Sequence, residues 1–106
     1  MDAHGLDELR AAREAAGRPY HEFLRVPSMS AGFYHLPAGG VDPQSPHDED
    51  EVYVVMHGRA WISVGGEERP VGPGDVVFVA AHVPHRFHDI KEDLEVIVVF
   101  APAETG

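Results

Sequence analysis

The chain has 106 residues, with 8 lysines and arginines against 18 aspartates and glutamates, which gives a formal net charge of −10. A chain of this length forms one domain with one hydrophobic core. A surface this acidic disfavours nucleic acid and anionic membranes as partners. Cysteine is absent, which excludes disulfides, a thiolate nucleophile and a cysteine-ligated zinc site. No apolar run approaches the roughly 20 residues of a membrane span, and no signal peptide is visible, so we expect a cytoplasmic protein.

The only helical pattern lies at the start of the chain. Leu6, Leu9, Ala12 and Ala16 recur at spacings of three and four residues, and the sequence Gly-Arg-Pro follows directly. Glycine and proline end helices, so the pattern stops there. The spacing predicts a short helical segment within residues 1–19, outside the main domain.

The rest of the chain, residues 20–106, has the pattern of a single all-β domain. Short apolar runs alternate with glycine, proline and aspartate, and the Gly-Gly pair at residues 65 and 66 indicates a hairpin turn. Short, evenly punctuated strands favour a small barrel or sandwich. The predicted strands are Tyr20–Val26, Met29–Leu36, Glu51–Met56, Ala60–Val64, Val76–Ala80, Arg86–Asp89 and Glu95–Phe100.

A first cluster of polar residues precedes an apolar strand in the stretch QSPHDEDEVYVVMHG, residues 44–58. His47 and Glu51 are four residues apart, so on a strand they share a face with Tyr53 and Val55. A carboxylate directed into a core is costly unless it is paired or binds a cation. This cost indicates a function for Glu51, whereas residues 48–50 are expected to form a solvated acidic turn.

A second cluster, AAHVPHRFHD, contains His82, His85 and His88. His85 shares its parity with Phe87 and is expected to face inward, whereas His88 is expected outside and His82 in a turn. Two imidazoles and one carboxylate form a half-filled coordination sphere that suits a divalent transition metal such as Fe, Mn, Ni or Zn. The alternative is that His47 is a surface turn residue and His85 a histidine at the rim of the barrel.

The spacing of both clusters resembles the cupin superfamily, which consists of small jelly-roll β-barrels. The first cupin motif reads glycine, five residues, His-x-His, three or four residues, Glu, six residues, glycine. Residues 39–58, GGVDPQSPHDEDEVYVVMHG, keep every spacing, with Ser45 in place of the first histidine. The second motif reads glycine, five residues, Pro-x-Gly, two residues, His, three residues, Asn. Residues 74–89, GDVVFVAAHVPHRFHD, keep this spacing, with Ala80, His82 and Asp89 replacing the usual residues.

The resemblance implies a single jelly-roll barrel over residues 20–106 and places His47, Glu51 and His85 at the metal-ligand positions of the family. Serine is a poor ligand for a divalent metal, whereas the neighbouring Gln44 offers an amide oxygen. We therefore interpret Gln44 as a fourth ligand or as a partner of the ligands. The alternative is a loop glutamine bonded to the backbone.

Apolar and aromatic residues are expected to form the pocket around these ligands, namely Phe33, Tyr53, Val55, Trp61 and Phe87. Tyr53 and His35 are the candidate catalytic residues. Arginines and lysine are scattered, which disfavours a phosphorylated substrate and favours a small neutral or chelating organic molecule.

The hypotheses for the whole chain are three. The first is a metal-dependent enzyme, in which oxidoreductase chemistry of the dioxygenase type is favoured over isomerase chemistry. The second is a non-catalytic binding or sensing cupin, and the third is a metal-free structural relic. A homodimer is expected, with the apolar stretch VIVVF, residues 96–100, and the N-terminal segment as contact surface. One barrel supports many chemistries, so the substrate and the native metal stay open.

Overall fold

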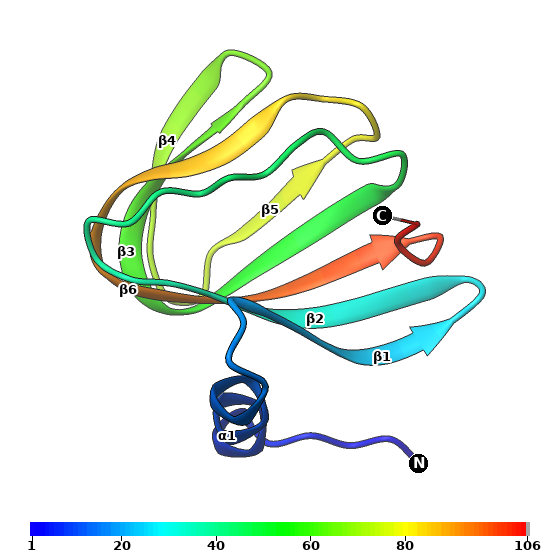
Figure 1. Cartoon of the computed structure of the whole chain (residues 1–106). Helices are drawn as coiled ribbons and strands as arrows, with labels where there is room; N and C mark the ends of the chain where they lie inside the picture. Colours follow the sequence, from blue (N-terminus) through cyan, green and yellow to red (C-terminus); the bar gives the residue numbers. More distant parts are fainter. Residues whose placement is uncertain (106) are drawn as a thin grey trace.

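The computed structural model describes residues 1–105, and this part of the chain contains one helix and six strands (Figure 1). Position 106, the last residue of the predicted β domain, lies outside the described residues. The elements are α1 (Leu6–Ala16), β1 (Tyr20–Val26), β2 (Met29–Leu36), β3 (Asp50–Val64), β4 (Glu67–Val71), β5 (Val76–Val79) and β6 (His85–Ala101).

The predicted N-terminal helix is confirmed as α1. It ends at Gly17, whose φ of 69° lies in the left-handed region that glycine adopts without steric penalty. Its buried residue is Leu9, and the helix packs against β1 and β2 on one side of the sheet (Figure 1). Arg10 also connects the helix to β6, because its Nε and Nη2 donate hydrogen bonds to the Glu95 carboxylate at 2.7–2.9 Å. In the described part of the chain, no helix has the length and apolarity to cross a bilayer.

The strands form one antiparallel sheet in the order β1-β2-β6-β3-β4, with β5 also paired to β3. Two pairs of predicted strands are single long strands in the structure. The predicted strands at 51–56 and 60–64 are joined in β3, and those at 86–89 and 95–100 are joined in β6. Register shifts lie between Val55 and Trp61, and at this place β3 and β6 curve so that the two halves of the sheet face one another (Figure 1).

The predicted barrel is not closed in the structure. Among residues 1–105, β1 pairs with β2 alone, whereas β4 and β5 each pair with β3 alone, so the sheet keeps open edges. Strand lengths and punctuation, which the sequence displays, do not determine whether the first and last strands of a sheet meet. The all-β class with a short N-terminal helix is confirmed.

The hydrophobic core lies between the two halves of the curved sheet. It includes Tyr53, Val55, Ile62, Phe87 and Leu94, each at most 2% exposed. The connection between β2 and β3, residues 37–49, runs across the open side of this curved sheet (Figure 1). It carries the first cluster of polar residues to the edge of the core, where the His82 amide donates to the His47 carbonyl oxygen at 2.7 Å.

Candidate metal centre

Three side chains from separate parts of the fold converge at the edge of the core. His47 comes from the connection before β3, Glu51 from the start of β3 and His85 from the start of β6. One nitrogen or oxygen atom of each lies within 4.8 Å of the others. Val64, at the far end of β3, is the strand partner of His85. Glu51 and His85 therefore meet because the sheet curves.

Two residues of this cluster, Glu51 and His85, are buried and have donor atoms without a hydrogen-bond partner in the described residues. Glu51 is 1% exposed, and its Oε1 lies 2.7 Å from Nε2 of His85. The direction of this contact does not suit a hydrogen bond. Within residues 1–105, both Glu51 oxygens and His85 Nε2 have no hydrogen-bond partner. A buried carboxylate in this state costs several kcal/mol, and a cation at the point that the three atoms face would offset this cost.

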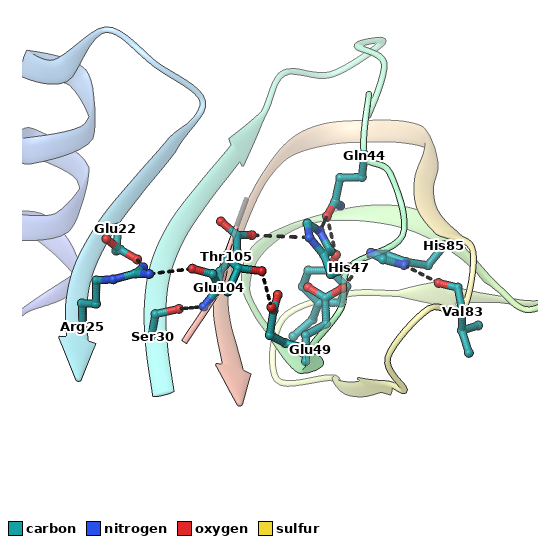
Figure 2. Close-up of polar contacts among 12 residues, drawn as sticks. Glu22, Arg25, Ser30, Gln44, His47, Glu49, Val83, His85, Glu104 and Thr105 are labelled. Carbon is teal, nitrogen blue, oxygen red and sulfur yellow. Dashed lines mark hydrogen bonds and ion pairs between the residues drawn. The ribbon is translucent and has the colours of Figure 1, made fainter. Parts of the chain in front are cut away.

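In both imidazoles, Nδ1 faces an oxygen atom of another residue (Figure 2). Nδ1 of His85 lies 2.9 Å from the Val83 carbonyl oxygen, which leaves Nε2 facing Glu51. Nδ1 of His47 lies 3.5 Å from a Glu104 carboxylate oxygen, and its Nε2 lies 3.5 Å from Gln44 Oε1. Metal-ligating histidines characteristically donate a hydrogen bond from their second ring nitrogen to a carbonyl or carboxylate group. The arrangement therefore fits a divalent transition metal bound by the two Nε2 atoms and Glu51.

Gln44 is oriented by a buried carboxylate that sequence reasoning missed. Its Nε2 donates to Asp42 Oδ2 at 2.8 Å, so its Oε1 faces the site and accepts a hydrogen bond from the Tyr53 hydroxyl at 2.8 Å. Asp42 also accepts from the Tyr34 hydroxyl at 2.6 Å and from the Phe87 amide at 2.9 Å. The amide oxygen of Gln44 is thereby held at the cluster, next to His47 and not against the backbone.

Two ionisable groups at the cluster have shifted pKa values. Burial raises the pKa of Tyr53 well above its ordinary value of 10, and the nearby Glu51 carboxylate adds to this effect. The phenol is therefore neutral at physiological pH. Burial alone lowers the pKa of His85, but the Glu51 carboxylate and the Val83 carbonyl together outweigh it and raise the pKa above 6.5.

A cavity of about 270 Å³ adjoins the cluster. His47, Gln44 and Glu104 are its polar lining residues, and none of its lining residues is a lysine or arginine in the described part of the chain. The remaining lining residues are Tyr20, Tyr34, Val98 and Phe100.

The predicted pocket residues divide into two groups. Tyr53, Val55 and Phe87 are buried in the core beneath the cluster. Phe33 and His35 are not brought there, because Tyr34 and Leu36 point into the core and the odd-numbered residues of β2 point to the opposite face. The strand partner of His35 is Glu95, which contacts Arg10 of α1, so His35 lies on the helix side of the sheet.

Trp61 also lies away from the cluster. It alternates with the core residue Ile62 on β3, is 39% exposed and pairs with His88 on the outer face. The predictions that Trp61 lines the pocket and that His35 acts at the cluster are therefore wrong, because both side chains point away from it.

The acidic turn before β3 differs from its expected solvated form at one position. Asp48 is largely exposed and pairs with His82 at 3.4 Å. Glu49, in contrast, is 4% exposed and accepts a hydrogen bond from the Thr105 hydroxyl at 2.8 Å. Glu49 and Glu104 were missed because their partners lie more than 50 residues away in the chain, where no local pattern reveals them.

Two residues that depart from the second motif keep an unusual backbone conformation. His82, at the position of the motif glycine, has φ of 70°, and Asp89, at the position of the asparagine, has φ of 47°. Both angles lie in the left-handed region, which glycine and asparagine adopt more readily than most residues. The backbone of the motif is therefore preserved although its residues differ. Ser45, at the position of the first histidine, is exposed.

Comparison with known families identifies the class of protein. A family model described as "Cupin domain" matches residues 32–100. The chain belongs to the cupin family, as the two motifs indicated. An uncharacterised protein of Streptomyces coelicolor is 53% identical over 105 residues, which are 99% of this chain and 100% of that protein.

Two further proteins are also similar. The dimethylsulfoniopropionate lyase DddQ of Ruegeria pomeroyi is 36% identical over 59 residues, which are 55% of this chain but 29% of DddQ. Its structure matches with a TM-score of 0.67 and 28% identity over 72% of this chain and 39% of that chain. The structure of KdgF from Halomonas matches with a TM-score of 0.72 and 25% identity over 78% of this chain and 76% of that chain. These likenesses support the jelly-roll cupin fold.

Proposed function

We propose that this cupin is a metal-dependent enzyme that acts on a small neutral or metal-chelating organic molecule. His47, Glu51 and His85 hold a divalent transition metal, and Gln44 supplies its amide oxygen as a fourth ligand. The observation that carries the proposal is the convergence of His47 with Glu51 and His85, whose buried donor atoms have no hydrogen-bond partner in residues 1–105. Such atoms are costly in a fold unless a ligand satisfies them.

The residues beside the ligands favour acid–base chemistry of the lyase or isomerase type. A divalent metal in this place would supply Lewis-acid polarisation of a coordinated substrate oxygen. Tyr53 is neutral and its hydroxyl donates to Gln44 at the cluster, so we assign it the role of a hydrogen-bond or proton donor that exchanges this partner for the substrate. The cavity wall contains the Glu104 carboxylate and no cationic side chain within the described residues, which favours neutral substrates over anionic ones. The partial likeness to a lyase supports this direction.

A second candidate is an iron-dependent dioxygenase. The specific observation in its favour is the donor set itself, because two histidines and one carboxylate with open positions are the ligands of many iron(II) oxygenases. A non-catalytic binding cupin would share the metal and the cavity but would convert no substrate.

Metal content is the first test of this proposal. Mass spectrometry of tag-free protein is expected to find near-stoichiometric iron, manganese, nickel or zinc in the wild type. The His47→Ala variant should lose the metal. The His4→Ala variant, which changes an exposed histidine distant from His47 in sequence, should retain it. A wild type that stays metal-free after reconstitution, or a metal content that His47→Ala leaves unchanged, would contradict the proposal.

The nature of the bound metal then selects the reaction assay. Iron leads to oxygen-uptake screening, and zinc or manganese to screening of elimination and isomerisation substrates by NMR. In either case Tyr53→Phe should lower kcat by about 10²–10⁴-fold while metal affinity is retained. Full activity of this variant would remove Tyr53 from the mechanism.

A further inference from the structure

The segment after β6, residues 102–105, lies beside the candidate metal centre and is called the tail segment below (Figure 2). It leaves the end of β6 and returns toward the start of β2. Its backbone is fixed at Glu104 on both sides: the Glu104 amide donates to Ser30 Oγ at 2.9 Å, and Arg25 Nη2 donates to the Glu104 carbonyl oxygen at 2.7 Å. Ser30 is fully buried. Thr105 adds a third contact through its hydrogen bond to Glu49.

These anchors aim the Glu104 side chain at His47. Its Oε2 lies 3.5 Å from Nδ1 of His47, and both side chains are mostly buried, with exposures of 23% and 16%. Phe100 packs against the same imidazole with its ring centroid 4.9 Å away in an edge arrangement. The ring is thus held by an aromatic contact and by a carboxylate, with Nε2 left to face Gln44.

Resting on the proposed metal site, we propose that Glu104 is a positioning residue for His47 and that the tail segment is the strap that carries it. The carboxylate keeps the proton of His47 on Nδ1, so that the lone pair of Nε2 is directed at the metal. It is the counterpart of the Val83 carbonyl at His85, but it comes from the tail and not from the motif. Partners of this kind typically change metal affinity by about 10- to 100-fold.

The test uses zinc as the probe and measures its dissociation constant by competition with a chromophoric chelator. Glu104→Ala is expected to weaken zinc binding by about 10- to 100-fold, and Glu104→Gln, which keeps an acceptor oxygen and the backbone anchors, by less. Asp48→Asn is the matched control, because Asp48 is an exposed carboxylate next to His47 in sequence whose side chain pairs with His82 at the surface. It should change zinc affinity by no more than about 3-fold, which measures the general effect of one lost charge.

A second readout separates positioning from a purely structural role. Two-bond ¹H–¹⁵N spectra of the imidazole rings report the tautomer, and His47 should carry its proton on Nδ1 in the wild type. Glu104→Ala should show a mixture of tautomers at His47 and leave His85 unchanged, while far-UV circular dichroism confirms the fold. Equal zinc affinity in Glu104→Ala and Asp48→Asn, or an unaltered His47 tautomer, would overturn the inference and leave the metal site standing. A wild type that binds none of zinc, iron, manganese and nickel would overturn both proposals together.

Discussion

Asp42 offers the sharpest test of how the site is held together. It is 5% exposed and accepts three hydrogen bonds, from the Tyr34 hydroxyl, the Phe87 amide and the Gln44 side chain. Asp42→Ala leaves the first two donors buried without an acceptor, at a cost of about 1–3 kcal/mol each. The free energy of unfolding should therefore fall by about 2–6 kcal/mol. For a domain whose whole stability is about 5–15 kcal/mol, this is a large fraction.

Asp42→Asn is the matched control for this change. The hydroxyl of Tyr34 can accept as well as donate, so an asparagine with its NH₂ toward Tyr34 keeps its oxygen for Phe87 and Gln44. We expect this variant to lose only about 1 kcal/mol, because it exchanges a charged acceptor for a neutral one.

Urea denaturation followed by circular dichroism measures both variants. The midpoint of Asp42→Ala should fall strongly with an unchanged m-value, and its melting temperature should drop by roughly 10–20 °C. The reasoning is refuted if Asp42→Ala costs under about 1 kcal/mol, or if asparagine is as damaging as alanine. In the first case the three contacts do not stabilise the fold; in the second the charge and not the hydrogen bonding matters.

Other predictions address the remaining parts of the fold. All three tyrosines have pKa values raised above 10, chiefly by burial, so above pH 10 the unfolded chain releases phenolic protons that the native state retains. This contribution to the free energy of unfolding is fully present below pH 10 and is lost as the pH rises above it. Phenolate absorbance should therefore appear together with unfolding and not before. Gly58→Ala should lower the free energy of unfolding by more than about 2 kcal/mol, because φ is 92° and an added Cβ would meet the Asp93 carbonyl oxygen at 2.2 Å. Gly66→Ala, where φ is 89° and the space around the glycine is open, should lower it by only about 1 kcal/mol in the same urea experiment. A double-mutant cycle on Arg10 and Glu95 should give a favourable coupling free energy, and a value near zero would show that this ion pair does not anchor α1. The expected homodimer stays a prediction, and light scattering at micromolar concentration that finds a monomer would contradict it.

The sequence predicted the central part of the site because β3 displays its faces clearly. One face of this strand is buried and the other partly exposed, so Glu51, Tyr53 and Val55 alternate with residues that contact solvent. The motif spacing added His47 and His85, which parity alone left open. The structure brings all of these residues together.

The same reasoning failed where both faces of a strand are covered. Five consecutive residues of β2 are buried, because α1 covers the face opposite the core, so the sequence shows no alternation that assigns Phe33 or His35 to a face. On β3, Trp61 and Ile62 are both large and apolar, and only the fold shows that the smaller of the two enters the core.

Loop carboxylates escaped prediction for a different reason. A sequence displays the polarity of Asp42, Glu49 and Glu104 but not the distant donors that allow them to be buried. The donors to Asp42 include the amide of a residue 45 positions away, and the donor to Glu49 lies 56 positions away. Hydrogen bonds across such separations follow from the tertiary fold, and local patterns do not encode them.

The distribution of charge around the cluster joins these observations to the proposed chemistry. Asp42, Glu49 and Glu51 are buried and Glu104 is partly buried, whereas the nearest facing groups are two imidazoles. Asp42 and Glu49 are satisfied by hydrogen bonds, but Glu51 is not satisfied within the described residues. The field at the cluster is therefore negative, and a divalent cation is the ligand that this field attracts most strongly. An anionic substrate would meet the same field unfavourably unless it bound the metal directly. A neutral molecule or a chelating one avoids this penalty, which is why the proposed function assigns such substrates to the candidate site.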